Sequence, residues 1–454
     1  MLPIDIGRYG SPELRKIFDE ENRLQKMLDV EAALVWAHSQ VGNISKNDAQ
    51  TIIGKASTKY VKLERVKEIE DEIRHDVMAL VRALTEVSGP SGAYVHLGAT
   101  SSDMLDTATA LQLKEAINII EERLNELQSV LLSRAEQHKK CIMMGRSHGQ
   151  HALPTTFGFK CAVWLREISR HIERLRDCRE RLLVGKMSGA VGTQAGLGPK
   201  ALEIQTLVME KLGIPAADIS TQIVQRDRYA ELTCVLAILA STLDGIATEV
   251  RQLQRPEIGE AFEAFEQKKQ VGSSTMPHKR NPMISERICG LAKLMRSFVL
   301  PALENVPTWH ERDLTQSSCE RFVLPEECIL IDYMLILMIR VLKGLQVDEK
   351  RMRTNMDLTQ GRMMSEAVML ALVKKGIGRQ TAHELTRELA IKSHNEQCSF
   401  KEVLSENNQV KKVLIPEELD KVMDPRNYLG TATKQIDNVI EKTRKERLAR
   451  GLPN

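Results

Sequence analysis

Aromatic residues are scarce in this sequence: Phe, Trp and Tyr together make up 4% of its 454 residues. The abundant residues are strong helix formers such as Leu, Met, Ala, Glu, Lys and Arg, whereas strand formers are few. Glycine and proline gather in a few clusters instead of recurring every ten residues, as they would in a β-sandwich or barrel. The composition therefore predicts an all-α fold.

An excess of charge of one sign is also missing, because 64 basic residues face 61 acidic ones. Such a balance is untypical of a dedicated nucleic-acid binder. No apolar run predicts a membrane span: Cys234–Leu243 is too short, and Cys328–Leu342 is broken by Asp332 and Arg340. The first ten residues lack a basic region followed by an apolar stretch, so we expect no secretory signal. A soluble, cytoplasmic protein without nucleic-acid or membrane partners is expected.

Paired cysteines are absent as well. The eight cysteines are scattered, with no C-x-x-C pair and no zinc-like spacing. We expect them to be reduced and packed in the interior. His148 and His151 are spaced for one helix face, but they lack a third ligand nearby in the sequence. These residues therefore predict no metal site.

Long stretches of helical periodicity fill the middle of the chain. They cover residues 102–139, 157–186, 225–254, 283–300 and 323–345. Breaks near residues 89–102 and 347–355 predict three helical domains, at 1–100, 101–352 and 353–454, the middle one a bundle of long helices. Residues 232–243 are apolar on nearly every side, so we expect this bundle to form the core of a homo-oligomer.

Two short motifs are set aside because their structural context is missing. Residues 145–149 (GRSHG) fit the G-x-S-x-G elbow of α/β-hydrolases, which requires a parallel sheet around it. Residues 196–201 fit a loose dinucleotide-binding pattern, but Pro199 and the lack of a βαβ unit favour an ordinary turn.

The most informative stretch is the loop at residues 272–282, GSSTMPHKRNP. A helix start rarely requires two serines, a lysine, an arginine and an asparagine together. Backbone N–H groups of a glycine-serine loop can face a carboxylate, and Lys279 adds a positive charge beside them. This loop predicts a carboxylate-binding catalytic site, whereas the alternative is a polar turn that caps the next helix.

Together with the blocks at 74–76 (RHD), 100–103 (TSSD), 145–151 (GRSHGQH) and 309–313 (WHERD), this loop resembles the fumarase/aspartase superfamily, and within it the adenylosuccinate lyases. The resemblance extends over most of the chain. It implies a C–N lyase of purine biosynthesis that eliminates fumarate from adenylosuccinate, giving AMP, and from SAICAR, giving AICAR. It also implies a homotetramer with active sites shared between subunits, and no metal or organic cofactor.

Fumarate elimination removes a proton from a carbon next to a carboxylate, so the resulting dianion must be stabilised and the departing nitrogen protonated. The resemblance assigns the base to Ser273 and the acid to His148. Lys279 stabilises the developing charge, and His75 is a second histidine at the substrate. Taken alone, His148 is also compatible with a core histidine, whereas the 74–76 block taken alone favours a surface ion-pair cluster that includes His75.

The resemblance implies further contacts with the succinyl carboxylates and with the phosphate, for which arginine forks are suited. Thr100, Ser101 and Gln222 are expected at the carboxylates, and Arg8, Tyr9, Arg312, Ser317 and Arg321 at the phosphate. The other expected substrate-binding residues are Arg74, Asp76, Ser147, Ser274, Arg280 and Asn281. Ser147 stands where the family usually has threonine. Serine also carries a hydroxyl, so we expect the role of this position to be kept.

Three alternatives compete with this function. A carboxymuconate cycloisomerase has a similar loop, but its substrate lacks a phosphate. An argininosuccinate lyase is disfavoured for the same reason. A helical scaffold without activity would be expected to have lost catalytic residues, whereas Ser273, His148, His75 and Lys279 are all present.

Overall fold

The structure is a computed structural model that describes residues 3–265, 275–276 and 278–453. Helices account for 69% of it, and within the described residues the strands form two small antiparallel sheets of two strands each. The predicted all-α class is confirmed. The parallel sheet that an α/β-hydrolase requires does not occur in these parts of the chain.

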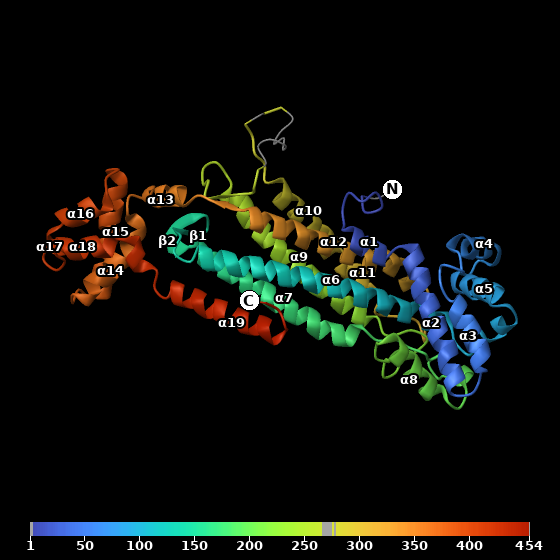
Figure 1. The fold of residues 1–454 in the computed structure, drawn as a ribbon. Coiled ribbons are helices and arrows are strands. Elements are labelled where there is room, and N and C mark those ends of the chain that lie inside the picture. The colour runs from blue at the N-terminus through green and yellow to red at the C-terminus, as the bar shows by residue number, and fades with distance from the viewer. Residues whose placement is uncertain (1–2, 266–274, 277, 454) are drawn as a thin grey trace. The chain divides into compact units, whose positions relative to one another are not determined.

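Five long helices carry the periodic stretches, and their bounds agree with the sequence prediction at most ends (Figure 1). They are α6 (Ser101–Gln137), α7 (Phe157–Leu182), α9 (Asp227–Leu253), α10 (Met283–Ser297) and α12 (Thr315–Gly344). Helix α12 begins earlier than predicted and continues through Pro325. Pro325 has no N–H to donate to the carbonyl of Arg321 one turn earlier, so α12 lacks one of its backbone hydrogen bonds there.

The chain divides into two compact units. Unit 1 comprises residues 1–125, 171–243 and 290–336, and unit 2 comprises residues 126–170, 244–289 and 337–454. The boundaries fall inside the long helices. The division into three domains stays a prediction.

Unit 1 contains the shorter elements of the N-terminal region and one part of each long helix. Its other elements are α1 (Pro12–Ile17), α2 (Glu20–Gln40), α3 (Lys46–Lys55), α4 (Leu63–Ile73), α5 (Asp76–Ser88), η1 (Gly89–Tyr94), η2 (Ala195–Leu197), α8 (Ala201–Leu212) and α11 (Val299–Glu304). Within this unit the long helices lie side by side, as Figure 1 shows. Arg176 of α7 donates to Glu121 of α6 at 2.6 Å, and His171 of α7 lies 2.9 Å from Thr242 of α9.

Helix α9 is long and apolar enough to cross a membrane by length and composition. Most of its apolar side chains are nevertheless buried inside the protein, among them Leu232, Leu236 and Leu243 at 0% exposure. It is therefore a core helix, in agreement with a soluble protein. A stripe on α9 stays partly uncovered within the chain, with Val235 half-buried and Ile238 48% exposed.

Unit 2 contains a β-hairpin, a short sheet and the C-terminal helices. Its elements are β1 (Ile142–Ser147), β2 (Gln150–Thr156), β3 (Ala261–Phe262), β4 (Gln346–Val347), α13 (Glu349–Asp357), η3 (Arg362–Met364), α14 (Ser365–Lys374), α15 (Arg379–Asn395), α16 (Phe400–Glu406), α17 (Asn408–Lys411), α18 (Pro416–Met423), η4 (Pro425–Tyr428) and α19 (Ala432–Ala449). Phe400 and Leu404 of α16 pack with Leu372 of α14 in the core of the C-terminal helices.

Candidate functional site

The predicted acid, His148, lies at the tip of the hairpin in unit 2. Strand β1 pairs with β2 so that Ser147 is opposite Gln150, which leaves His148 and Gly149 as a two-residue turn. Their φ angles are 53° and 72°, the left-handed values that the common hairpin turn requires at both positions. The turn leaves Ser147 and His148 exposed. The imidazole is thus presented to solvent by a short, tightly defined support.

A buried carboxylate that was not predicted from the sequence holds this hairpin close to its tip. Glu260 is completely buried and accepts two hydrogen bonds from the guanidinium of Arg146, at 2.9 and 2.6 Å. Asn355 of α13 donates to the same carboxylate at 2.7 Å. A bidentate pair of this kind orients Arg146 and so the strand that leads to His148. Glu260 lies far from Arg146 in sequence, and no local pattern indicates the contact.

His151 follows the turn on β2. Burial and the positive charge of Arg146 lower the pKa of His151. Its Nδ1 is buried and has no hydrogen-bond partner in the described part of the chain. A neutral ring is therefore favoured for His151.

The predicted base, Ser273, and its neighbour Ser274 lie outside the described residues. The remainder of the loop precedes α10 in unit 2, where Lys279 and Arg280 are exposed and Asn281 is half-buried. These three residues line a cavity of about 720 Å³ together with His278. The predicted loop residues that are described thus share one cavity.

The start of α10 is fixed by another buried carboxylate, that of Glu263. It accepts hydrogen bonds from the N–H groups of Ile284, at 3.2 Å, and Ser285, at 2.6 Å. A carboxylate at the positive end of a helix is stabilising. Gln254 also donates to the carbonyl of Arg280, at 3.1 Å. Both contacts hold the chain that follows the loop.

In unit 1, the block at residues 74–76 forms the tight junction between two helices. Arg74 ends α4 in a left-handed conformation, with φ at 58°, and its side chain is 82% exposed. His75 precedes α5 and accepts a hydrogen bond on its Nδ1 from the N–H of Met78, at 3.3 Å. Asp76 is the first residue of α5. His75 is therefore the N-cap residue of α5, and its side chain is exposed.

Asp76 connects this junction to two arginines. Its carboxylate accepts a hydrogen bond from Arg321 at 2.8 Å, and Arg23 lies at 4.0 Å. Burial opposes ionisation of Asp76, but the N–H of Val77 and the charge of Arg321 together lower its pKa. Burial and the charge of Arg321 lower the pKa of Arg23. Arg321 is thus joined to the 74–76 block within one chain.

Three residues expected at the phosphate line one cavity of unit 1, with a volume of about 300 Å³: Arg312, Ser317 and Arg321. Arg312 donates to Gln222 at 3.2 Å, and its buried Nε has no partner within the described ranges. Arg321 is half-exposed. The cavity therefore offers guanidinium and hydroxyl donors of the kind that bind phosphate.

The wall of this cavity contains a buried ion-pair cluster that the sequence analysis also missed. Arg226 contacts Asp106 at 2.9 Å and Glu320 at 2.8 Å. Burial raises the pKa of Glu320, although Arg226 opposes that shift. Arg226 is neutralised by two carboxylates, so the donors left for an anion belong to the other arginines of the cavity.

Thr100 and Ser101, expected at the succinyl carboxylates, stand at the start of α6 and are half-buried. The N–H of Thr100 donates to Asp103 at 2.9 Å, and Asp103 forms a buried ion pair with Lys186. The N–H of Ser188 donates to the same carboxylate at 2.9 Å. This pair fixes the start of α6 against the segment around residue 188.

Near the N-terminus, Arg8 is exposed, whereas Tyr9 is half-buried with its ring 5.7 Å from that of Tyr333 on α12. Neither residue lines the cavity that contains Arg312. The structure therefore brings together some of the expected phosphate residues within unit 1 and leaves Arg8 and Tyr9 outside that cavity.

Family models and curated relatives match most of the chain. The family described as Lyase matches residues 7–295, and the one described as Adenylosuccinate lyase C-terminus matches residues 361–439. The chain is 56% identical over 439 residues to the adenylosuccinate lyase of Pyrococcus horikoshii, with 97% of each chain covered. It is 50% identical over 440 residues to that of Methanocaldococcus jannaschii, with 97% of this chain and 95% of the relative covered.

Solved structures of related enzymes share the fold. The 3-carboxy-cis,cis-muconate lactonizing enzyme of Pseudomonas putida has a TM-score of 0.90 and 33% identity, covering 98% of this chain and 99% of its own. A fumarate lyase of Mesorhizobium sp. BNC1 has a TM-score of 0.89 and 32% identity, and the match covers 96% of this chain and 99% of the fumarate lyase. The identity to the adenylosuccinate lyases is higher than to either structure.

Proposed function

The chain belongs to the adenylosuccinate lyase family of the fumarase/aspartase superfamily, and we propose that it eliminates fumarate from adenylosuccinate, giving AMP, and from SAICAR, giving AICAR. It is a C–N lyase that acts on a small molecule in purine biosynthesis. The observation that carries the choice of a nucleotide substrate is the cavity shared by Arg312, Ser317 and Arg321. A carboxymuconate or argininosuccinate has no phosphate for these donors to bind.

The proposed mechanism divides proton transfer between two residues. Ser273, deprotonated to an alkoxide that the positive charge of Lys279 stabilises, takes the proton from the carbon next to the succinyl carboxylate and becomes a neutral hydroxyl. The electron pair moves into that carboxylate, and the C–N bond then breaks as His148 donates a proton to the nitrogen. Lys279 offers positive charge to the dianion. Exposure of His148 at a well-defined turn supports its role, because the acid must reach a bound substrate.

Positioning of the substrate is proposed for the other residues. Thr100, Ser101 and Gln222 bind the succinyl carboxylates. The role of Gln222 is supported by its contact with Arg312, whose guanidinium donates a hydrogen bond to the side-chain oxygen of Gln222. His75 contacts the substrate from the start of α5, where its backbone is fixed by the cap. The remaining expected residues stay proposals for substrate binding.

We further propose a cytoplasmic homotetramer. Support comes from the partly uncovered stripe on α9, where Val235 is half-buried and Ile238 is 48% exposed. Leu300 and Leu303 of α11 are also exposed, at 65% and 49%. Apolar groups on a long bundle of this kind are typical of an interface between copies.

The substrate is tested by mixing the purified protein with adenylosuccinate and following the ultraviolet absorbance change. AMP and fumarate are expected in equal amounts. Carboxymuconate and argininosuccinate serve as parallel substrates, and neither should be converted. Turnover of one of these two without turnover of adenylosuccinate would overturn the proposed function.

Shared sites are tested by complementation. Ser273→Ala and His148→Ala are each expected to be inactive, but hybrids refolded from a mixture should regain part of the activity. Some sites in a hybrid then contain both intact residues, contributed by different chains. If mass spectrometry shows hybrids and the mixture stays inactive, the two residues act from the same chain.

A further inference from the structure

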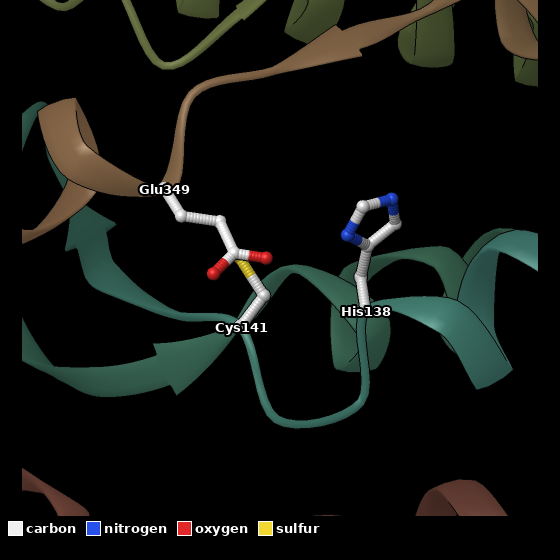
Figure 2. Close-up of side chains that lie close together, drawn as sticks. All are labelled: His138, Cys141 and Glu349. Atoms are coloured by element: carbon white, nitrogen blue, oxygen red, sulfur yellow. The ribbon is translucent and has the colours of Figure 1, made fainter.

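Three potential metal ligands meet in unit 2, and none of them is among the predicted catalytic or substrate-binding residues. They are His138, which follows α6, Cys141, which precedes β1, and Glu349, the first residue of α13. One ligand atom from each lies within 4.8 Å of the other two. Figure 2 shows the Glu349 carboxylate beside the Cys141 sulfur, with one nitrogen of the His138 ring turned toward them.

The histidine of this group lacks the hydrogen bonds that a buried imidazole normally makes. His138 is 6% exposed, and neither Nδ1 nor Nε2 has a partner among the residues that the structure describes. Buried polar groups without partners are rare because each costs free energy. One face of the ring is occupied by Phe157, at 5.4 Å between ring centres. A ligand for one of the nitrogens would explain this otherwise costly burial.

We propose that His138, Cys141 and Glu349 bind a divalent zinc-type cation. Imidazole nitrogen, thiolate sulfur and carboxylate oxygen are the three donor types that zinc takes in proteins. Bonds of about 2.0–2.3 Å in a tetrahedral site put the ligand atoms roughly 3.3–3.8 Å apart, so the side chains need to close by about 1 Å. Glu349 is exposed and can supply that movement.

Metal binding uses the neutral imidazole and the thiolate, and a bound cation itself deprotonates a coordinated thiol. The thioether of Met352, 3.5 Å from the Cys141 sulfur, adds a further soft atom beside the site.

The backbone already holds two of the ligands in place. The carbonyl of His138 accepts from the N–H groups of Cys141 and Gly158, both at 3.0 Å, and the carbonyl of Cys141 accepts from Phe157 at 2.9 Å. A side chain at position 158 would place its Cβ 2.5 Å from the backbone of Lys139, so glycine permits this close approach. The ligand-bearing loop is thus preformed between α6 and α7.

A cation here would join three segments at the base of the hairpin. Cys141 directly precedes β1, and Glu349 begins α13, the same helix from which Asn355 reaches the carboxylate of Glu260. The site is therefore assigned a structural role: it ties the end of α6 and the start of β1 to α13. These three ligands show no zinc-like spacing in the sequence because Glu349 is distant from His138 and Cys141 along the chain.

The test uses the full-length protein, treated with a chelator and dialysed, and then titrated with Zn²⁺ and separately with Co²⁺. We expect one tight Zn²⁺ per chain, a higher melting temperature with Zn²⁺, and a near-ultraviolet thiolate-to-cobalt charge-transfer band. Cys141→Ser should remove the band. Glu349→Gln should weaken Zn²⁺ binding by at least about 10- to 100-fold, the loss typical of altered second-shell groups.

Cys161→Ser is the matched control, because Cys161 on α7 is a buried cysteine in the same unit and is not part of the cluster. It should bind both ions like the unaltered protein. Glu349→Gln changes an exposed side chain, so loss of Zn²⁺ binding with retained helicity by circular dichroism separates ligation from misfolding. Absence of stoichiometric Zn²⁺ binding, or equal binding by Glu349→Gln and Cys161→Ser, would overturn the proposal. Neither outcome depends on lyase activity.

Discussion

Replacement of Arg321 by alanine tests the proposed phosphate site. The side chain of Arg321 is 51% exposed and donates to Asp76 at 2.8 Å. A hydrogen bond to a charged group contributes about 1.5–3 kcal/mol. Because water and salt screen a half-exposed guanidinium, we expect the lower end of that range. A loss of about 1.4 kcal/mol is tenfold, so kcat/KM for adenylosuccinate should fall about tenfold or slightly more.

The assay compares kcat/KM for adenylosuccinate with that for succinyladenosine, which lacks the phosphate. Arg321→Ala should affect the phosphorylated substrate, mainly through KM, and leave the other nearly unchanged. Arg65→Ala is the control, since Arg65 forms an exposed pair with Glu86 in the same unit and does not line the cavity. Equal losses for both substrates would refute the assignment of Arg321 to the phosphate.

Two further predictions concern the stability of unit 1. Burial disfavours the charged form of His96, but the hydrogen bond that its protonated ring donates to the Glu31 carboxylate raises the pKa of His96 above 6.5. The stabilisation is therefore complete below pH 6.5 and is lost as pH rises through the higher folded-state value. His96→Gln should remove this pH dependence of the melting temperature, and an unchanged profile would contradict it. Asp103→Asn breaks a buried pair with Lys186 and should lower the free energy of unfolding by about 3–5 kcal/mol. Glu126→Gln, which breaks an exposed ion pair with Lys343, is the control and should lower the free energy of unfolding by less than about 1 kcal/mol. Urea melts measure both variants, and similar losses for the two would contradict the prediction.

The long helices were predictable because local periodicity determines them. Residues 102–139 and 157–186 were expected to be helical, and α6 and α7 fill most of both ranges. The start of α12 was missed: the helix begins at Thr315, whereas residues 315–322 (TQSSCERF) are mostly polar and give little apolar periodicity. The hairpin that carries His148 was missed too, since two short strands leave little periodic signal.

The candidate site residues were predictable from the sequence, but the buried residues that hold them in position were not. Arg312, Ser317 and Arg321 came from the family resemblance, and they line one cavity. The groups that hold the site in place, such as Glu260 beneath Arg146, are brought in by tertiary packing. A buried carboxylate without a neighbouring motif gives no sequence signal, because its partner is distant along the chain.

The most direct test of the account is turnover and substrate binding by Ser273→Ala. The unaltered protein is expected to release fumarate and AMP in equal amounts from adenylosuccinate. The variant should lose nearly all turnover yet bind adenylosuccinate with little change, because a base acts in the transition state and contributes little to ground-state binding. Retention of the unaltered kcat by Ser273→Ala would contradict the assignment of Ser273 as the base.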